Sequence, residues 1–129
     1  MNDKLIELAK KAQKNAYAPY SNFKVGAAIL TKSGKIFTGA NVENASYGLS
    51  CCAERNAIFK AVSEGETQFS KIVVVGDTEE PISPCGACRQ VMAEFGDFEV
   101  ILVGKNGNIK KTTVSELLPY NFDKENLNK

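Results

Sequence analysis

Four cysteines form two tight clusters in the chain, a pattern more typical of metal or redox sites than of a secreted disulfide framework. Cys51 and Cys52 are neighbours, Cys85 and Cys88 form a Cys-x-x-Cys pair, and Glu54 follows Cys52 by two residues. Three thiolates on zinc leave the fourth tetrahedral position free for water, as in catalytic zinc sites. We therefore expect Cys52, Cys85 and Cys88 to bind one zinc ion, with the carboxylate of Glu54 close to it.

Two other interpretations of the cysteines remain open. Cys85 and Cys88 could form the redox pair of a thiol-disulfide oxidoreductase, although this leaves Cys52 and Glu54 without a role. A structural zinc module would need Cys51 as a fourth ligand. Because neighbouring residues point their side chains in divergent directions, we expect Cys51 to be a small, half-buried residue that does not bind the metal.

The chain contains no histidine, so every mechanism that depends on histidine is excluded. A carboxylate beside a zinc-activated water can replace histidine as the proton carrier, and Glu54 is suitably placed. Three thiolates give the zinc site a net charge of −1, which calls for positive compensation. Arg55, Arg89 and two helix N-termini could supply it, because both cysteine clusters lie where a loop passes into an expected helix.

The composition is that of a soluble globular protein, with 43% hydrophobic and 24% charged residues. A length of 129 residues predicts one domain over residues 1–129. Sixteen basic and fifteen acidic residues leave a net charge of +1, which argues against nucleic-acid and membrane partners. Residues 1–14 lack the apolar core of a signal peptide, so we expect a cytoplasmic location.

Hydrophobic periodicity predicts an α/β layered domain around a mixed sheet. Helical spacing runs through residues 5–16, 52–64 and 86–95, and strand-like runs occupy residues 25–30, 36–40, 71–76, 100–103 and 109–113. The middle of the chain alternates strand and helix, which is the pattern of parallel βαβ units. The polar tail, residues 123–129, is expected to fray.

Several motifs together resemble the small, homotetrameric type of cytidine deaminase, in the cytidine/deoxycytidylate deaminase superfamily. The central ones are Cys52-Ala53-Glu54-Arg55 and Pro84-Cys85-Gly86-Ala87-Cys88-Arg89-Gln90. Further matches are Tyr17-Ala18-Pro19-Tyr20-Ser21, Phe23-Lys24-Val25-Gly26-Ala27-Ala28, Gly39-Ala40-Asn41-Val42-Glu43-Asn44-Ala45-Ser46-Tyr47 and Leu117-Leu118-Pro119. Because these motifs occur in order over nearly the whole chain, the resemblance is far more specific than one Cys-x-x-Cys pair.

This resemblance implies a three-layer α/β/α sandwich with a central mixed five-stranded sheet and one zinc ion per subunit, held by the three cysteines. It also implies that Glu54 moves protons, and that Arg55 and Gln90 donate hydrogen bonds to ligand thiolates. Phe23 would pack near the pyrimidine, while Asn41 and Glu43 would hold the ribose hydroxyls.

The resemblance further implies a homotetramer in which a neighbouring subunit completes each site. Ala45 and Tyr47 would lie near the ribose of another subunit's substrate, and Phe122 would stack over the base. The expected reaction is hydrolysis of cytidine and 2'-deoxycytidine to uridine and 2'-deoxyuridine with release of ammonia, a step of pyrimidine salvage. A deaminase of another cytosine nucleoside, such as blasticidin S, is the nearest alternative, and the 41–45 segment and Arg55 favour plain cytidine.

Overall fold

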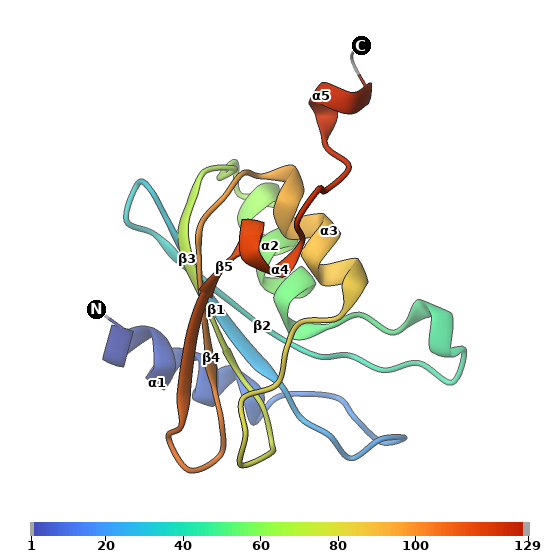
Figure 1. The fold of residues 1–129 in the computed structure, drawn as a ribbon. Helices are drawn as coiled ribbons and strands as arrows, with labels where there is room; N and C mark the ends of the chain where they lie inside the picture. Colours follow the sequence, from blue (N-terminus) through green and yellow to red (C-terminus); the bar gives the residue numbers. More distant parts are fainter. Residues whose placement is uncertain (1, 128–129) are drawn as a thin grey trace.

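A five-stranded sheet with strand order β2-β1-β3-β4-β5 forms the centre of the computed structural model, which describes residues 2–127 (Figure 1). The elements in chain order are α1 (Asn2–Gln13), β1 (Gly26–Thr31), β2 (Ile36–Ala40), the short 3-10 helix η1 (Tyr47–Leu49), α2 (Ala53–Ser63), β3 (Phe69–Val75), α3 (Gly86–Glu94), β4 (Glu99–Val103), β5 (Ile109–Thr113), α4 (Val114–Leu117) and α5 (Lys124–Leu127). None of the helices in this range is both long and apolar enough to cross a membrane.

The sheet is mixed, as expected. β1 runs antiparallel to β2 and to β3, and β4 runs antiparallel to β5. Only β3 and β4 are parallel neighbours, and α3 forms the crossover between them. Helix α2 also joins two strands of the same direction, but β1 lies between them in the sheet. The expected βαβ pattern therefore yields one pair of parallel neighbours rather than a parallel sheet.

Helices cover both faces of the sheet, which confirms the three-layer α/β/α sandwich (Figure 1). On one face, Leu5 and Ala9 of α1 pack in a cluster with Val73 and Ile101. On the other face, Ile58 of α2 and Met92 of α3 share a larger cluster with Ile72 and Val100. Strand β3 contributes alternate side chains to the two clusters. Both faces of the central strands are buried, which explains their continuous apolar sequence.

Two segments differ from the pattern in the sequence. The helical spacing extends to Ala16, but α1 ends at Gln13, because Tyr17 must turn away to pair with Val42 in an isolated parallel bridge. Near the C-terminus, where a frayed tail is expected, residues 124–127 form one helical turn projecting away from the sheet (Figure 1). The Asp123 carboxylate accepts the N–H groups of Glu125 and Asn126 at its start. Residues 128–129 of that expected tail lie outside the described range.

Candidate metal centre and active-site cavity

Three cysteine sulfurs converge where the N-termini of α2 and α3 meet. Cys52 immediately precedes α2, Cys85 immediately precedes α3, and Cys88 lies in the first turn of α3. The Sγ atom of Cys85 lies 3.7 Å from that of Cys52 and 3.4 Å from that of Cys88. All three sulfurs lie within 4.8 Å of one another. The fold thus brings together residues that are 33 positions apart in the chain.

The donor set fits zinc. Tetrahedral coordination with Zn–S bonds of about 2.3 Å separates sulfurs by about 3.8 Å, close to the distances found here. Cys88 is buried, Cys52 is half-buried and Cys85 is exposed, so the cluster is closed on the protein side and accessible on the other. Three soft sulfur donors on one accessible edge match the ligand number and type of a catalytic zinc site.

Cys51 lies outside this cluster of sulfurs. Its backbone N–H and carbonyl both pair with Val42, which incorporates it into a short antiparallel bridge. Burial raises the pKa of its thiol. This placement agrees with the expectation that Cys51 is half-buried and separate from the metal site.

Arg55 provides positive charge at the sulfur cluster. Its Nη2 donates to Cys52 Sγ over 3.6 Å. Hydrogen bonding from the Cys88 thiol and from Arg55 outweighs burial and lowers the pKa of Cys52 to about 5. The pKa of Cys88 is raised, because its proton is engaged in that bond and its thiol is buried. Within residues 2–127, the Nε atom of Arg55 is buried without an acceptor, so the half-buried guanidinium makes only part of the hydrogen bonds it could.

Glu54 is the only carboxylate among the buried polar residues of the described chain, with 4% of its surface exposed. It lies in the first turn of α2 and lines a cavity of about 280 Å³ together with Cys52 and Cys85. Burial raises the pKa of its carboxyl to about 7, and the nearby Cys52 thiolate adds to this, whereas Arg55 opposes it. A buried carboxyl group therefore stands beside the sulfur cluster and faces an accessible cavity.

The same cavity includes three of the residues expected to bind substrate, Phe23, Asn41 and Glu43. The Asn41 side chain is tied to the backbone before β1, since its Oδ1 accepts from Val25 N–H and its Nδ2 donates to the Phe23 carbonyl, both over 2.8 Å. Glu43 accepts three hydrogen bonds from residues 20–21. The pKa of Glu43 is lowered, chiefly by the hydroxyl of Ser21.

Five further cavity residues had no role predicted from the sequence, namely Ser21, Val25, Ala53, Ile82 and Ser83. Ser21 ends one of the motifs quoted above, and Ser83 directly precedes Pro84-Cys85. Position within or next to a motif was therefore the available signal for the two serines. Ile82 had no signal in the sequence, because an isolated isoleucine in a loop gives no indication of what it contacts.

The other residues expected to bind substrate lie outside this cavity. Ala45 and Tyr47 belong to the loop around η1, and the Tyr47 side chain is 73% exposed and packs edge-on against the ring of Tyr20. Phe122 is 61% exposed on the segment that leads to α5. Within one chain, the structure does not bring these three residues to the sulfur cluster.

Two side chains of α3 make hydrogen bonds other than those expected from the sequence. Gln90 Nε2 donates to the Phe122 carbonyl over 2.7 Å rather than to a thiolate. Gln90 follows Cys88 by two residues, which is a rotation of about 200° around the helix and turns it away from the cluster. Arg89 donates to the carbonyls of Pro84 and Leu117, so it ties the start of α3 to α4 instead of compensating the thiolates.

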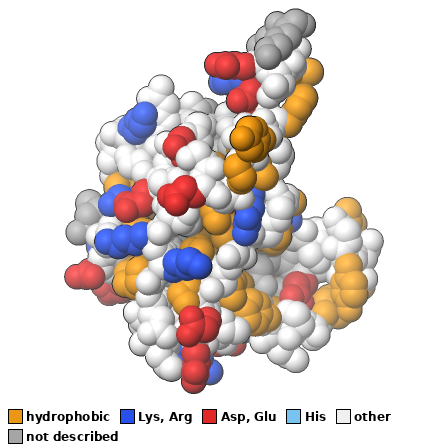
Figure 2. Space-filling model, viewed as in Figure 1, with side chains coloured by type: hydrophobic (Ala, Val, Ile, Leu, Met, Phe, Trp, Pro, Cys, Tyr) orange, Lys and Arg blue, Asp and Glu red, His pale blue; other side chains and the backbone are white. Residues whose placement is uncertain are grey.

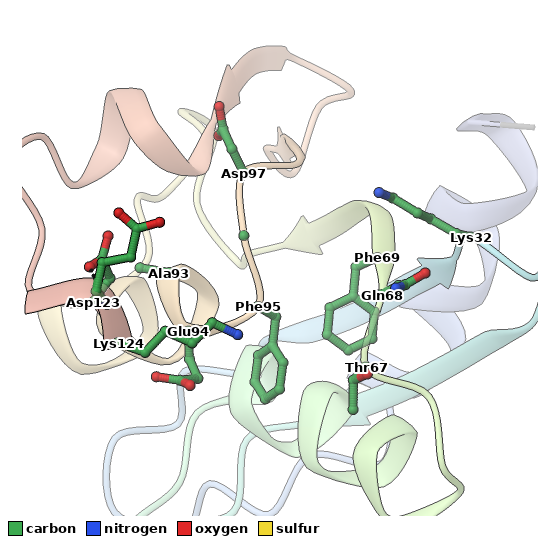
Figure 3. A pocket seen from close by; sticks show the side chains of 12 residues that line it. Lys32, Thr67, Gln68, Phe69, Ala93, Glu94, Phe95, Asp97, Asp123 and Lys124 are labelled. Atoms are coloured by element: carbon green, nitrogen blue, oxygen red, sulfur yellow. Dashed lines mark hydrogen bonds between the residues drawn. The ribbon is translucent and has the colours of Figure 1, made fainter. Parts of the chain in front are cut away.

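A larger hollow, of about 620 Å³, lies elsewhere. Figure 3 shows it between Phe69 and Phe95 on one side and Asp123 and Lys124 of the C-terminal segment on the other. None of the cluster cysteines lines it. The C-terminal segment forms one of its walls, whereas Cys52, Glu54 and Cys85 line the smaller cavity.

Comparison with known proteins agrees with this site. Residues 1–104 match the family model of the cytidine and deoxycytidylate deaminase zinc-binding region. A cytidine deaminase from Sporosarcina psychrophila is 54% identical over 97% of this chain and 93% of its own length. A blasticidin-S deaminase from Bacillus cereus is 34% identical over 91% of each chain.

Comparison with solved structures points to the same family. The crystal structure of cytidine deaminase from Burkholderia pseudomallei superposes with a TM-score of 0.92 and 55% identity, covering 95% of this chain and 99% of that one. The family match and the high identity over almost the full length exclude a chance likeness of the cysteine motif. The chain therefore belongs to the zinc-binding cytidine and deoxycytidylate deaminase family.

Proposed function

We propose that this chain is a cytidine deaminase, which hydrolyses cytidine and 2'-deoxycytidine to uridine and 2'-deoxyuridine with release of ammonia. Cys52, Cys85 and Cys88 hold one zinc ion. The observation that carries this proposal is the convergence of three sulfurs and the buried Glu54 carboxyl on one accessible cavity. The reaction belongs to pyrimidine salvage, and residues 1–129 act as one catalytic domain.

Glu54 carries the protons of the reaction. Zinc, when bound, supplies a Lewis acid that activates water for attack on C4 of the cytosine ring. The Glu54 carboxylate takes a proton from that water and passes it to N3 of the ring. It then takes the remaining proton of the attacking oxygen, now bound to C4, and delivers it to the departing amino nitrogen. One carboxyl group can serve all these steps because it alternates between its two protonation states. The absence of histidine is then no obstacle.

The other cavity residues bind the nucleoside. Phe23 packs against the pyrimidine, and Asn41 and Glu43 bind the ribose hydroxyls. A carboxylate accepts hydrogen bonds from sugar hydroxyls but repels a phosphate group. This favours a nucleoside over a nucleotide as substrate. Arg55 compensates the charge of the thiolates, whereas Gln90 supports the segment that carries Phe122.

The active protein is a homotetramer with shared sites. Ala45, Tyr47 and Phe122 lie outside the cavity of their own chain, and the apolar residues Tyr47 and Leu49 are more than 70% exposed on the η1 loop. Figure 2 shows hydrophobic side chains on this projecting loop and on the C-terminal segment. Burial of such a surface against a second copy would bring these residues to the substrate of a neighbouring subunit.

The decisive experiment is incubation of the zinc-loaded protein with cytidine, followed by ultraviolet absorbance and chromatographic identification of uridine. We expect conversion by the wild-type protein and a rate at least about 100-fold lower for Glu54→Gln. Blasticidin S is assayed in parallel, because the relative named for that substrate is also similar over most of its length. Conversion of blasticidin S without conversion of cytidine would replace the proposed substrate.

A further inference from the structure

The hydroxyl of Ser21 connects two walls of the active-site cavity. Ser21 lies in the loop between α1 and β1, and its Oγ donates to Oε2 of Glu43. The same oxygen accepts the backbone N–H of Phe23 over 3.0 Å. A hydroxyl has one proton to donate and two lone pairs to accept with, so both bonds form at once. One small side chain thereby links the residues that we assign to the sugar and to the base.

The carboxylate of Glu43 is held in one orientation by this loop. Its Oε1 accepts the backbone N–H groups of Tyr20 and Ser21, each over 3.1 Å, and its Oε2 accepts the Ser21 hydroxyl. A carboxylate offers about four acceptor positions, so these bonds leave about one free. Without them, a side chain as accessible as Glu43 would exchange between several rotamers. The loop therefore presents the carboxylate ready to accept a hydroxyl group.

Other contacts hold the backbone of both segments without help from Ser21. The N–H of Glu43 donates to the Tyr17 carbonyl over 2.8 Å, and the N–H of Asn22 donates to the Ala18 carbonyl over 2.9 Å. Asn41 ties the residues before β1 to the end of β2. Loss of the Ser21 hydroxyl should therefore free Oε2 of Glu43 to rotate away from its observed orientation, with Oε1 still held by backbone N–H groups and the fold intact.

We propose that Ser21 is a positioning residue for nucleoside recognition, which orients the Glu43 carboxylate toward the sugar hydroxyls. This inference rests on the proposed function and deepens it. Ser21 makes no hydrogen bond to Glu54 or to the cysteines in the described structure. Its effect accordingly falls on substrate binding and not on the proton transfers at the base.

The test is to combine removal of the Ser21 hydroxyl with removal of the substrate hydroxyls. Ser21→Ala and Ser21→Thr are compared with the wild type on cytidine and on 2',3'-dideoxycytidine, the latter as substrate or as competitive inhibitor. In Ser21→Ala we expect the KM for cytidine to rise about tenfold, as for loss of a hydrogen bond to a charged group, with kcat nearly unchanged. The KM or inhibition constant for dideoxycytidine should change little, because this compound lacks the 2'- and 3'-hydroxyls that Glu43 would bind. Ser21→Thr keeps a hydroxyl and should restore most of the cytidine affinity.

Ser33→Ala is the matched control. Ser33 Oγ donates to a carboxylate oxygen of Glu66 over 2.7 Å at the β1–β2 turn, away from the cavity. Ser33→Ala should change neither the KM for cytidine nor the constant for dideoxycytidine. Thermal unfolding shows whether each variant is folded. Equal losses for cytidine and dideoxycytidine, or no loss in Ser21→Ala, would overturn the inference while wild-type turnover of cytidine still supports the proposed function. A wild-type protein inactive on cytidine would overturn both.

Discussion

Gly39 of β2 lies directly against Ala57 of α2, so closely that a Cβ atom on Gly39 would overlap the backbone nitrogen of Ala57. The same Cβ would lie 2.6 Å from the carbonyl oxygen of Ala53, at the start of the helix. The missing side chain allows α2 to rest on the edge of the sheet. Because Cys52 and Glu54 lie at that end of α2, this close contact helps to set their position relative to Cys85 and Cys88.

Gly39→Ala should therefore loosen the metal centre. The added methyl must push α2 off the sheet, and overpacking of this kind costs about 1–3 kcal/mol of stability. The measurement is urea unfolding together with zinc affinity at a temperature where the variant is folded. Gly26→Ala is the control, since a Cβ there would meet the backbone of α1, 2.6 Å from Gln13 N, on the opposite face. Both variants should lose stability, but only Gly39→Ala should also bind zinc more weakly. An equal loss of zinc affinity in Gly26→Ala and Gly39→Ala would show that the contact of Gly39 with α2 does not position the metal site.

Substitution of individual cysteines should distinguish the three zinc ligands from Cys51, which does not bind the metal. Cys88→Ser removes the buried sulfur of the cluster, and we expect loss of stoichiometric zinc and of activity. Cys51→Ser should retain zinc, because Cys51 lies outside the cluster. The measurement is the amount of zinc per protein chain that each variant retains after gel filtration. Loss of zinc from Cys51→Ser would instead support four-sulfur ligation and a structural zinc module.

Glu54→Gln should keep the fold and the zinc but lose activity. The amide has nearly the same shape but cannot carry a proton between water and the ring, and loss of general acid-base catalysis typically costs 10²–10⁴-fold in rate, about 3–5 kcal/mol. The turnover number and the zinc content are measured on the same preparation. Normal turnover in a zinc-loaded sample would show that another group moves the protons.

Removal of zinc should destabilise the protein. Zinc binds the folded site, where three cysteines are close together, better than it binds the unfolded chain. We expect chelation to abolish activity and to lower the midpoint of thermal unfolding, and added zinc to restore both. Activity that survives complete removal of zinc, as checked by elemental analysis, would refute a metal-dependent reaction.

Shared sites predict complementation between two inactive variants. Glu54→Gln lacks the proton carrier of its own cavity, and Tyr47→Ala lacks an aromatic side chain that we assign to a neighbour's site. Mixing the two after reversible dissociation should produce some sites with both residues intact and so regain part of the activity. The control mixes each variant with itself. A wild-type protein that is active as a monomer would exclude this arrangement.

The sequence alone determined the chemistry of this protein. The spacing of Cys52, Glu54, Cys85 and Cys88 and the lack of histidine indicate a zinc site served by a carboxylate, and the apolar periodicity places the helices and strands within a few residues. These features depend on residue type and on neighbours in the chain, so they can be read locally.

Which of these groups meet depends on the tertiary structure. The insertion of β1 between β2 and β3, the contact of Ser21 with Glu43, and the turn of Gln90 toward Phe122 all join segments distant in sequence. Such contacts depend on how the helices pack on the sheet and on which way each side chain points. The exposed positions of Tyr47 and Phe122 have the same origin, since their segments project from the sandwich and leave both aromatic rings outside the cavity of their own chain.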